Sequence, residues 1–474
     1  MKIKRLLTGL AVAGIAVAPA APAFAESPTE MTPESIAAYA EKAFDDSGLP
    51  ALSLVVTKDD RVLYAHGYGE GTDGAAVTAL TPMRVASLSK SFTAMAVMKL
   101  VEAGKIRLDA TVASQLPGFT MADPRFAEIT VRHLLNQTSG LSDRGLDAEA
   151  VTGSPDLAAV ASSLADGELM RDPGADYEYC NANYDLAAAL VEAASGEPFA
   201  EYLDREVFDA LGMTGTSLGE APEGYIEGFG VWATAAEIDD GPLVGGSGNV
   251  VSNAEDMGRW LITQNGFGPQ LVGPESLSTM HSSSAVDEYA MGWGVEQPGD
   301  GGPARLAHAG NLFTYTANQV IIPETGYGFA VMTPSSALYD ESYDVLTGLV
   351  DMSQGRAAGE VGTLWTVELG IGVAVLAAIG LGVLGVVRAR RWAQRRSGHP
   401  VWRFALRLSP LALPVLLLAA YPSLVALLYR RDITWEQCWY RAPSVLILLV
   451  AGAAAGVAVI TARVARVRAA RVAR

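Results

Sequence analysis

Cysteine is scarce in this chain: Cys180 and Cys438 are the only two among 474 residues. Two thiols cannot supply the disulfide framework of a small secreted protein, so a stapled scaffold is excluded and we expect both cysteines to be unbridged. Histidine is scarce as well, and His66, His133 and His281 show no metal-ligand spacing. The sequence therefore predicts no metal site.

Basic residues are few outside the two ends of the chain, which the formal net charge of −18 conceals. The residues from Arg388 onward carry 15 Arg and two acids, a net charge of +13, and Met1–Arg5 adds +3. The residues between these segments therefore carry a net charge of −34. So strong an acidic excess argues against nucleic acid as a partner and keeps this part of the chain soluble.

Charged residues are absent from three long apolar runs near the C-terminus, Leu369–Val387, Leu408–Leu428 and Ala442–Ala462. Each is long enough to cross a hydrocarbon core of roughly 30 Å as a helix. Buried core helices are the alternative, which three such runs in succession disfavour. The runs predict three transmembrane helices. Gly452-Ala-Ala-Ala-Gly456 in the third has a helix-packing spacing, although chance accounts for it equally well in an Ala-rich segment.

Arginine sets the expected orientation of these spans. The segment Arg388–Arg407 carries seven Arg and Arg463–Arg474 carries five, without an acid in either, whereas Tyr429–Arg441 is mixed. The positive-inside rule therefore predicts a cytoplasmic first linker and C-terminus, with the N-terminal domain outside. We expect the basic tail to act as a topology determinant against the lipid of the cytoplasmic membrane.

The N-terminus has the layout of a secretory signal peptide. Met1–Arg5 is basic, Leu6–Val17 is apolar, and Ala23-Phe-Ala25 is a small-residue cleavage signal. A transmembrane anchor is disfavoured because the apolar run is too short. The predicted organisation is a signal peptide over 1–25, an exported domain over 26–352, a linker over 353–368, spans over 369–387, 408–428 and 442–462, and a tail over 463–474.

The exported domain begins and ends with strand patterns and has helical patterns between them. Ala51–Thr57 and Arg61–His66 predict one hairpin, and Ala317–Pro323 with Gly328–Thr333 predict another. Helices are expected at three places: from near Ser87 to Glu102, over Leu186–Ala194 and over Ala254–Thr263. The order of elements predicts an α+β domain, an antiparallel sheet flanked by helices plus a helical region.

Ser87-Leu-Ser-Lys90 places a hydroxyl and an amine on one face of a helix. An amine held beside a serine can take its proton and so turn a poor nucleophile into an acyl acceptor. In the first turn of a helix, unpaired N–H groups favour developing negative charge. Two further motifs follow, Tyr179-Cys-Asn181 and His308-Ala-Gly310. Together they indicate a secreted or membrane-held serine hydrolase.

The motifs of the exported domain resemble those of the serine β-lactamase superfamily. The likeness covers about Pro33 to Leu349 and is strongest to the class C β-lactamases, D-alanyl-D-alanine carboxypeptidases and family VIII esterases. The segments on which this resemblance rests are Arg84-Val-Ala-Ser87 through Asp109, Leu134–Leu141, Pro173-Gly174 before Tyr179-Cys-Asn181, Gly248–Met257, Met291-Gly-Trp-Gly294 and His308-Ala-Gly310. The resemblance implies a β-lactamase/transpeptidase-like fold, followed here by the three spans.

The resemblance also implies roles for individual residues. Ser87 is the nucleophile, and either Lys90 or Tyr179, which the x-Asn spacing selects over Tyr177, is the base. Asn181 positions the acyl chain or Lys90, and the oxyanion hole is made by the backbone N–H groups of Ser87 and Asn311. Gly310 lets substrate approach the strand backbone. No metal or organic cofactor is required, because the protein supplies every group.

His308 stands where many β-lactamases have lysine. A lysine is a permanent cation, whereas an imidazole is half-charged only near pH 6.5. A constant anchor for the carboxylate of a β-lactam or a D-Ala terminus is therefore missing, which shifts weight from antibiotic hydrolysis toward peptidase or ester cleavage.

We expect a membrane-tethered, extracytoplasmic acyl-serine hydrolase whose substrate is a small molecule or cell-wall peptide with a peptide amide, β-lactam or ester. Two alternatives stay open: a carboxylesterase, and a receptor that binds penicillin or a wall fragment without turning it over.

Overall fold

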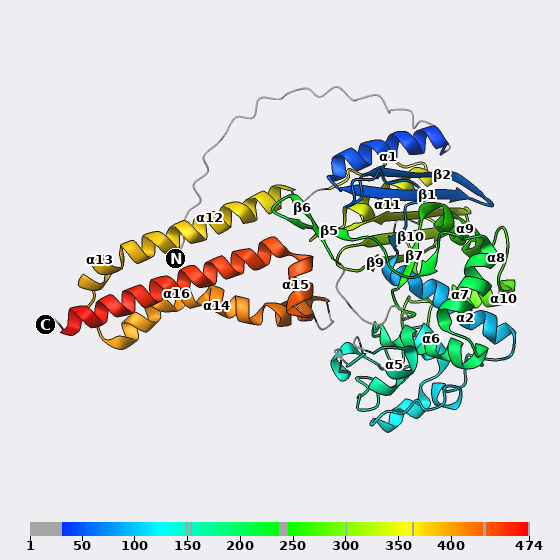
Figure 1. Ribbon diagram of the computed structural model, residues 1–474, viewed down its shortest axis with the longest axis horizontal. Coiled ribbons are helices and arrows are strands. Elements are labelled where there is room, and N and C mark those ends of the chain that lie inside the picture. The colour runs from blue at the N-terminus through cyan, green and yellow to red at the C-terminus, as the bar shows by residue number, and fades with distance from the viewer. Residues whose placement is uncertain are drawn as a thin grey trace, which may run out of the picture.

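The computed structural model describes residues 31–147, 150–151, 154–236, 245–299, 301–362, 365–429 and 433–472. The predicted signal peptide lies outside the described residues. The described chain forms a large N-terminal domain, from which three long C-terminal helices project side by side (Figure 1).

A six-stranded antiparallel sheet forms the centre of the N-terminal domain, in the order β2-β1-β11-β10-β9-β8. Its strands are β1 (Ala51–Lys58), β2 (Arg61–Gly69), β8 (Gly294–Glu296), β9 (Arg305–Asn311), β10 (Thr316–Ile322) and β11 (Tyr327–Thr333). Both predicted hairpins are present, β1–β2 and β10–β11. They meet because β1 also pairs with β11, from Ser53 opposite Met332 to Lys58 opposite Tyr327.

Helices cover both faces of this sheet, which explains why β10 and β11 are buried along their whole length. On one face, α1 (Pro33–Ser47) and α11 (Glu341–Ser353) enclose a core that includes Leu52 and Leu54. The other face packs against α9 (Ala254–Gln264) and the helical region, where Ala51 and Val55 point. The predicted α+β arrangement is thus confirmed.

The helical region holds the segment that carries the serine motif. Its helices are α2 (Ser89–Glu102), α3 (Val131–Leu135), α5 (Leu157–Ser163), α6 (Ala182–Ser195), α7 (Phe199–Leu203), α8 (Asp209–Leu211) and α10 (Pro274–Met280). Phe92 anchors α2 through a ring contact with Trp260 of α9, their centroids 4.1 Å apart, and an edge contact with Phe208. The predicted helices over Leu186–Ala194 and Ala254–Thr263 lie within α6 and α9.

Two small sheets complete the domain. One pairs β3 (Met83–Arg84), β7 (Val250–Ser252) and β4 (Ser217–Leu218). The other joins β12 (Ser335–Ser336), β5 (Gly224–Gly228) and β6 (Val231–Ala235), and it lies on the side of the domain that faces the C-terminal helices (Figure 1).

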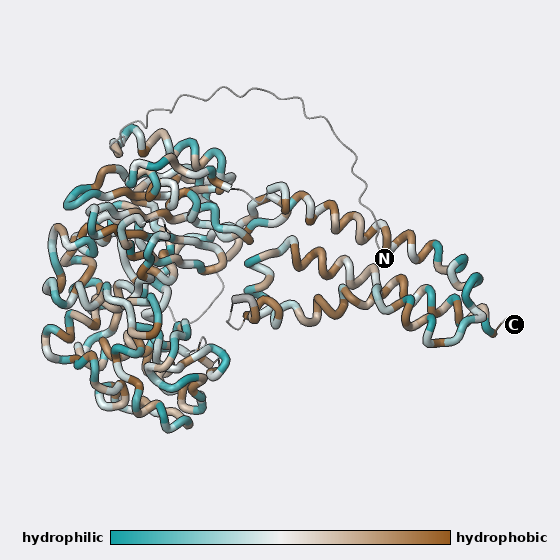
Figure 2. Tube along the Cα trace, turned by 180° about the vertical axis from the view of Figure 1, so that it is seen from behind, coloured by the Kyte–Doolittle hydropathy of each residue, from teal (hydrophilic) through white to brown (hydrophobic). Residues whose placement is uncertain are grey.

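Three C-terminal helices are long and apolar enough to cross a membrane: α12 (Trp365–Val387), α14 (Val401–Tyr429) and α16 (Pro443–Val472). Short α13 (Ala389–Gln394) and α15 (Trp435–Arg441) connect them. The helices extend beyond the charge-free runs, so Glu368 lies in the first turn of α12. Figure 2 shows apolar residues along most of their length, and many of these side chains are exposed, as expected of helices surrounded by lipid.

Small residues let these helices pack closely. The predicted Gly452–Gly456 spacing faces α14: a Cβ on Gly456 would collide with the carbonyl oxygen of Leu411, and one on Gly452 would lie 3.2 Å from Pro414 Cβ. Gly382 of α12 similarly approaches Ala455. The helices therefore depend on glycine for their separation.

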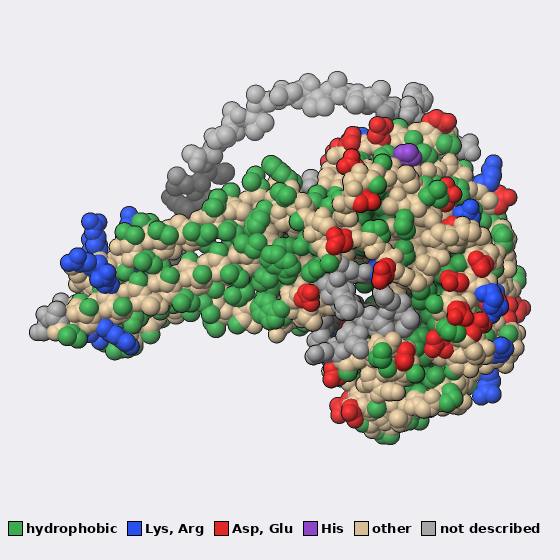
Figure 3. All heavy atoms as spheres, in the orientation of Figure 1, with side chains coloured by type: hydrophobic (Ala, Val, Ile, Leu, Met, Phe, Trp, Pro, Cys, Tyr) green, Lys and Arg blue, Asp and Glu red, His purple; other side chains and the backbone are tan. Residues whose placement is uncertain are grey.

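Charge is divided along the long axis of the molecule. Figure 3 shows that Lys and Arg gather at the end of the helices that lies away from the N-terminal domain, whereas acids are spread over the domain. The three helices thus separate a basic end from an acidic domain.

Candidate active site

Ser87 lies in a one-turn 3-10 helix, Ala86–Leu88, directly before α2. The predicted helix start near Ser87 falls within this turn, which continues into α2. Ala86, at the start of the turn, has a left-handed φ of 51°, which is uncommon for a residue other than glycine. A strained non-glycine residue of this kind persists only where its surroundings fix it. The nucleophile candidate consequently sits on a tight, rigid turn.

Lys90 is fully buried beside this turn. Its Nζ lies 3.1 Å from Ser87 Oγ, 2.9 Å from Asn181 Oδ1 and 2.6 Å from the carbonyl oxygen of Ser247. The Ser247 segment is fixed in turn, because its backbone N–H donates to buried Asp185 at 3.1 Å. Burial raises the pKa of Asp185 to about 6, although the hydrogen bonds from this segment lower it.

These contacts suit either protonation state of the amine. The oxygens of Asn181 and Ser247 can only accept hydrogen bonds. A neutral Lys90 amine can donate to both and direct its lone pair at the Ser87 hydroxyl. A protonated Lys90 can donate to all three oxygens. The site can therefore hold the amine before and after it takes a proton.

Tyr179 approaches Ser87 from another segment of the chain. Its hydroxyl lies 2.8 Å from Ser87 Oγ, and its ring centre is 4.8 Å from Lys90 Nζ. The four predicted residues Ser87, Lys90, Tyr179 and Asn181 thus form one hydrogen-bonded group. Ser87 Oγ is its centre, since two titratable groups reach it.

Gln137 is a residue whose importance sequence reasoning missed. It lies within the Leu134–Leu141 motif with a left-handed φ of 57°. Its side-chain Oε1 accepts the backbone N–H of Cys180 at 3.0 Å and the Nδ2 of Asn183 at 2.5 Å. The Leu134–Leu141 motif therefore holds the Tyr179 segment in place. Nothing in the sequence links the two motifs, which lie far apart along the chain. Cys180 and Cys438 are both buried and form no disulfide, as predicted.

Gly310 on β9 lies against the nucleophile turn. A Cβ on Gly310 would lie 2.7 Å from Val85 O, 2.8 Å from Ala86 Cβ and 2.9 Å from Ser87 N. The sequence predicted that Gly310 admits substrate to the strand; in the structure the Val85–Ser87 backbone occupies the space that a side chain would need. Glycine is required there because two backbones meet.

The end of β9 is an open sheet edge. β8 pairs with β9 only as far as Gly294 opposite Ala307. Leu312 N donates to Tyr315 O, so the neighbouring pair, Asn311 opposite Thr316, is not hydrogen-bonded in an antiparallel ladder. The Asn311 N–H therefore points away from β10, toward the open edge. This is the direction that the predicted oxyanion role needs.

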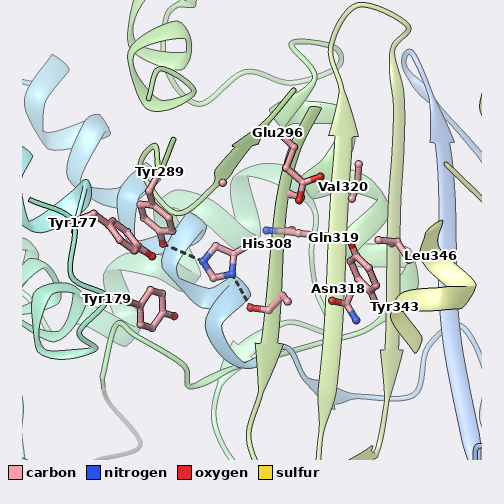
Figure 4. Close-up of a pocket in the computed structure, with 13 residues that line it drawn as sticks. Tyr177, Tyr179, Tyr289, Glu296, His308, Asn318, Gln319, Val320, Tyr343 and Leu346 are labelled. Atoms are coloured by element: carbon pink, nitrogen blue, oxygen red, sulfur yellow. Dashed lines mark hydrogen bonds between the residues drawn. The ribbon is translucent and has the colours of Figure 1, made fainter. Parts of the chain in front are cut away.

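His308 lies on the same edge and makes two hydrogen bonds (Figure 4). Its Nδ1 lies 2.8 Å from the Ala309 carbonyl oxygen, which can only accept, so Nδ1 carries the proton. Nε2 then accepts from the Tyr289 hydroxyl at 3.0 Å. Burial lowers the pKa of His308 to about 4, and the Lys90 amine acts in the same direction. A pKa this low leaves the imidazole neutral near pH 7, in agreement with the expectation that no constant cation stands at this position.

Tyr289 was not anticipated, although it lies two residues before the Met291-Gly-Trp-Gly294 motif. Burial raises the pKa of its hydroxyl well above the usual value, which keeps it a hydrogen-bond donor. Its ring contacts those of Tyr177 and Tyr179, with centroids 5.6 and 6.3 Å apart. Tyr177 thus belongs to the aromatic wall of the site, not to the group around Ser87.

A pocket of about 290 Å³ opens beside His308 and Tyr179. Figure 4 shows three tyrosines on one side of His308 and the strands of the sheet on the other. Glu296 is the one formally charged side chain in its lining, and it pairs with Arg305 at 2.6 Å. The lining is otherwise aromatic, apolar or neutral polar. Within the described ranges, no cluster of three or more His, Cys, Asp or Glu side chains that would suit a metal ion is found.

Comparison with known proteins places this geometry in context. Residues 36–344 match the family model described as Beta-lactamase. The chain is 26% identical over 310 residues to Protein flp of Staphylococcus aureus strain N315, covering 61% of each protein. It thus spans about three fifths of the length of such curated relatives.

Solved structures share the fold. The octameric penicillin-binding protein homologue from Pyrococcus abyssi superposes with a TM-score of 0.61 at 22% identity, over 70% of this chain and 79% of that one. EstCE1, a hydrolase with promiscuous acyltransferase activity, superposes with a TM-score of 0.57 at 19% identity, over 68% and 97%. At these identities the likeness concerns the fold.

Proposed function

Because the chain belongs to the Beta-lactamase family, we propose that it is a membrane-tethered serine hydrolase that works through an acyl-enzyme on Ser87. One observation carries the proposal: Ser87 Oγ lies 3.1 Å from Lys90 Nζ and 2.8 Å from the Tyr179 hydroxyl. These are the distances over which a proton leaves a nucleophile for a general base.

Acylation proceeds in two steps. The Ser87 hydroxyl proton passes to the Lys90–Tyr179 pair while Oγ forms a bond to the carbonyl carbon, and the carbonyl oxygen becomes an oxyanion. The backbone N–H groups of Ser87 and Asn311 stabilise this charge. Collapse then breaks the bond to the amine or alcohol, which leaves with the proton that Ser87 gave up. Hydrolysis of the ester on Ser87 repeats the sequence with water as the nucleophile.

The lining of the pocket beside His308 favours a substrate whose part bound there carries no carboxylate. His308 is neutral, and no described lysine or arginine appears in the pocket lining. A carboxylate would find no bidentate or fixed cationic partner there. A peptide amide or β-lactam of low charge is the first candidate. A carboxylic ester is the second, favoured by the same lack of a cationic side chain in the lining.

We further propose that the N-terminal domain faces outward and that the C-terminus is cytoplasmic. The domain lies at one end of the three helices, and a group of Lys and Arg side chains gathers at the other (Figure 3). The positive-inside rule assigns the basic end to the cytoplasm. Protease treatment of intact cells tests this: cleavage within Arg388–Arg407 from outside would invert the topology.

The experiment that tests the function uses the full-length protein in detergent with a fluorophosphonate probe, a fluorescent penicillin and a short-chain nitrophenyl ester. Ser87→Ala is the control. We expect labelling and turnover with the native protein and neither with the variant. Ester turnover without a penicillin adduct would favour the esterase, and a stable adduct without turnover would favour the receptor. Full labelling of Ser87→Ala would refute the acyl-serine mechanism.

A further inference from the structure

The β5–β6 hairpin lies between the membrane helices and the central sheet (Figure 1). Its tip, Phe229–Gly230, is a tight turn with left-handed φ angles of 56° and 76°. On the domain side, Trp232 Nε1 donates to the Gly48 carbonyl oxygen at 2.8 Å. The hairpin is therefore attached to the domain at its flank and free to present its tip to the helices.

The tip meets Glu368, in the first turn of α12. Glu368 is only 2% exposed. One carboxylate oxygen accepts the Phe229 backbone N–H at 2.8 Å, and the other accepts the Ser444 hydroxyl of α16 at 2.9 Å. A single side chain thus joins two membrane helices to the hairpin. The contact is close, because a Cβ on Gly230 would lie 2.8 Å from the ring of Trp365.

A buried carboxylate is demanding in its hydrogen bonds. Leaving one of its oxygens without a donor costs more than losing a contact between neutral groups. The hairpin tip and the ends of α12 and α16 therefore hold one another in a narrow range of positions. A second tie, from the Tyr440 hydroxyl of α15 to the Ala236 carbonyl oxygen at 2.8 Å, lies just past the end of β6.

From the tip, β5 leads back to the candidate active site. β5 pairs in parallel with β12, Tyr225 opposite Ser335 and Ile226 opposite Ser336. The side chain of Asn311 donates from Nδ2 to Ser336 Oγ at 3.0 Å.

Two other contacts bind the turn after β9 to the same layer. The Thr316 hydroxyl accepts a hydrogen bond from Asn311 Nδ2 at 3.0 Å. It donates one to the Ser335 carbonyl oxygen at 2.9 Å. The Tyr315 hydroxyl donates to the Pro222 carbonyl oxygen at 2.7 Å, just before β5. The end of β9 and the turn after it are therefore tied to β12 and to the residue before β5 through the side chains of Asn311, Thr316 and Tyr315.

We propose that Glu368 is a positioning residue for the Asn311 end of β9. Its carboxylate fixes the hairpin tip, the hairpin fixes β12, and β12 fixes the side chain of Asn311. The membrane helices thereby complete the alignment of the strand edge and do more than anchor the domain. The catalytic role of that strand edge rests on the proposed function, whereas the positioning by Glu368 does not.

Hydrogen–deuterium exchange tests the connection without relying on activity. The full-length protein in detergent micelles is compared with Glu368→Gln, in which an amide replaces the carboxylate and can no longer accept both donors. The matched control is Glu360→Gln, an exposed acid eight residues earlier. We expect faster exchange in peptides covering the hairpin, residues 309–317 and residues 335–337, with α5 unchanged. Acceleration limited to the hairpin tip and the helix ends would overturn the proposal.

Ser444→Ala keeps the test decisive if Glu368→Gln does not fold, because it removes one donor and leaves the carboxylate. The same peptides should then respond to a smaller degree, and no response in residues 309–317 would overturn the proposal.

The catalytic consequence is measured separately. Against a nitrophenyl ester, Glu368→Gln should lower kcat by on the order of tenfold with little change in KM, because a misaligned oxyanion donor acts on the transition state. Glu360→Gln should leave both unchanged. Equal effects on kcat from the two variants would contradict positioning. If the native protein showed neither ester turnover nor probe labelling, that result would count against the proposed function alone. The exchange measurement does not depend on activity and would still test the positioning role.

Discussion

Gly310→Ala tests the closest contact in the site. The added Cβ would lie 2.7 Å from Val85 O and 2.9 Å from Ser87 N, whereas ordinary contact begins at 3.4 Å. One of the two backbones must therefore move by about 0.5 to 0.7 Å, and neither can do so by rotating a side chain. Overpacking of this kind costs about 1–3 kcal/mol of unfolding free energy.

The effect on activity should exceed the effect on stability. The segment that yields carries either Ser87 or Asn311, and a misplacement near 1 Å of reacting groups lowers a rate by about 10²-fold. We expect the rate of fluorophosphonate labelling to fall by one to two orders of magnitude. The thermal midpoint of the domain should fall by several degrees.

The matched control is Gly299→Ala, where a Cβ meets nothing within 4 Å. Gly299 lies on the connection between β8 and β9, and Gly310 lies in β9. The two variants therefore differ mainly in what the added methyl group contacts. If Gly310→Ala labelled at the native rate, the close approach of β9 to the nucleophile turn would be refuted. Equal losses in both variants would show that glycine at these positions matters for backbone freedom and not for space.

Three other expectations follow from the same structure. Lys90→Met should slow labelling by about 10²–10⁴-fold, as loss of a general base does, and unchanged labelling would leave Tyr179 as the sole base. Since the pKa of His308 is about 4 in the folded state and 6.5 unfolded, stability should fall as pH drops from 6.5 to 4, by up to about 3 kcal/mol. Chemical denaturation should show a smaller dependence in His308→Gln, and equal slopes would contradict the neutral imidazole. Gly456→Leu should separate α16 from α14 and lower the thermal midpoint in detergent, unlike Gly380→Leu, where a Cβ meets nothing within 4 Å.

Local patterns were sufficient for the elements themselves. The hairpins β1–β2 and β10–β11 follow from short apolar runs divided by turn residues, and α6 from an Ala- and Leu-rich segment. The pairing of β1 with β11 joins residues 269 to 279 positions apart, and no local pattern encodes it. It arises because both strands must bury two faces, which only a shared sheet between two helical layers provides.

In the candidate active site, too, local motifs predicted some features and not others. The spacing of Ser87 and Lys90 and the Tyr-x-Asn motif predicted which side chains meet, because each motif is short and carries its own chemistry. The predicted helix start near Ser87 agrees with the helical turn at Ala86–Leu88, but nothing in the sequence marks Ala86 as left-handed. Gly310 of β9 lies against this turn, a contact between distant parts of the chain that no local pattern encodes.

Electrostatics depended most on contacts that the motifs do not contain. His308 in isolation titrates near pH 6.5. In the fold, the Ala309 carbonyl oxygen fixes its proton on Nδ1, Tyr289 donates to Nε2, and burial opposes a second proton. A strand-edge histidine therefore becomes a neutral, oriented dipole. The cleft consequently has polar groups at fixed positions without a fixed positive charge, and selection among acyl substrates should follow their hydrogen-bonding pattern more than their charge.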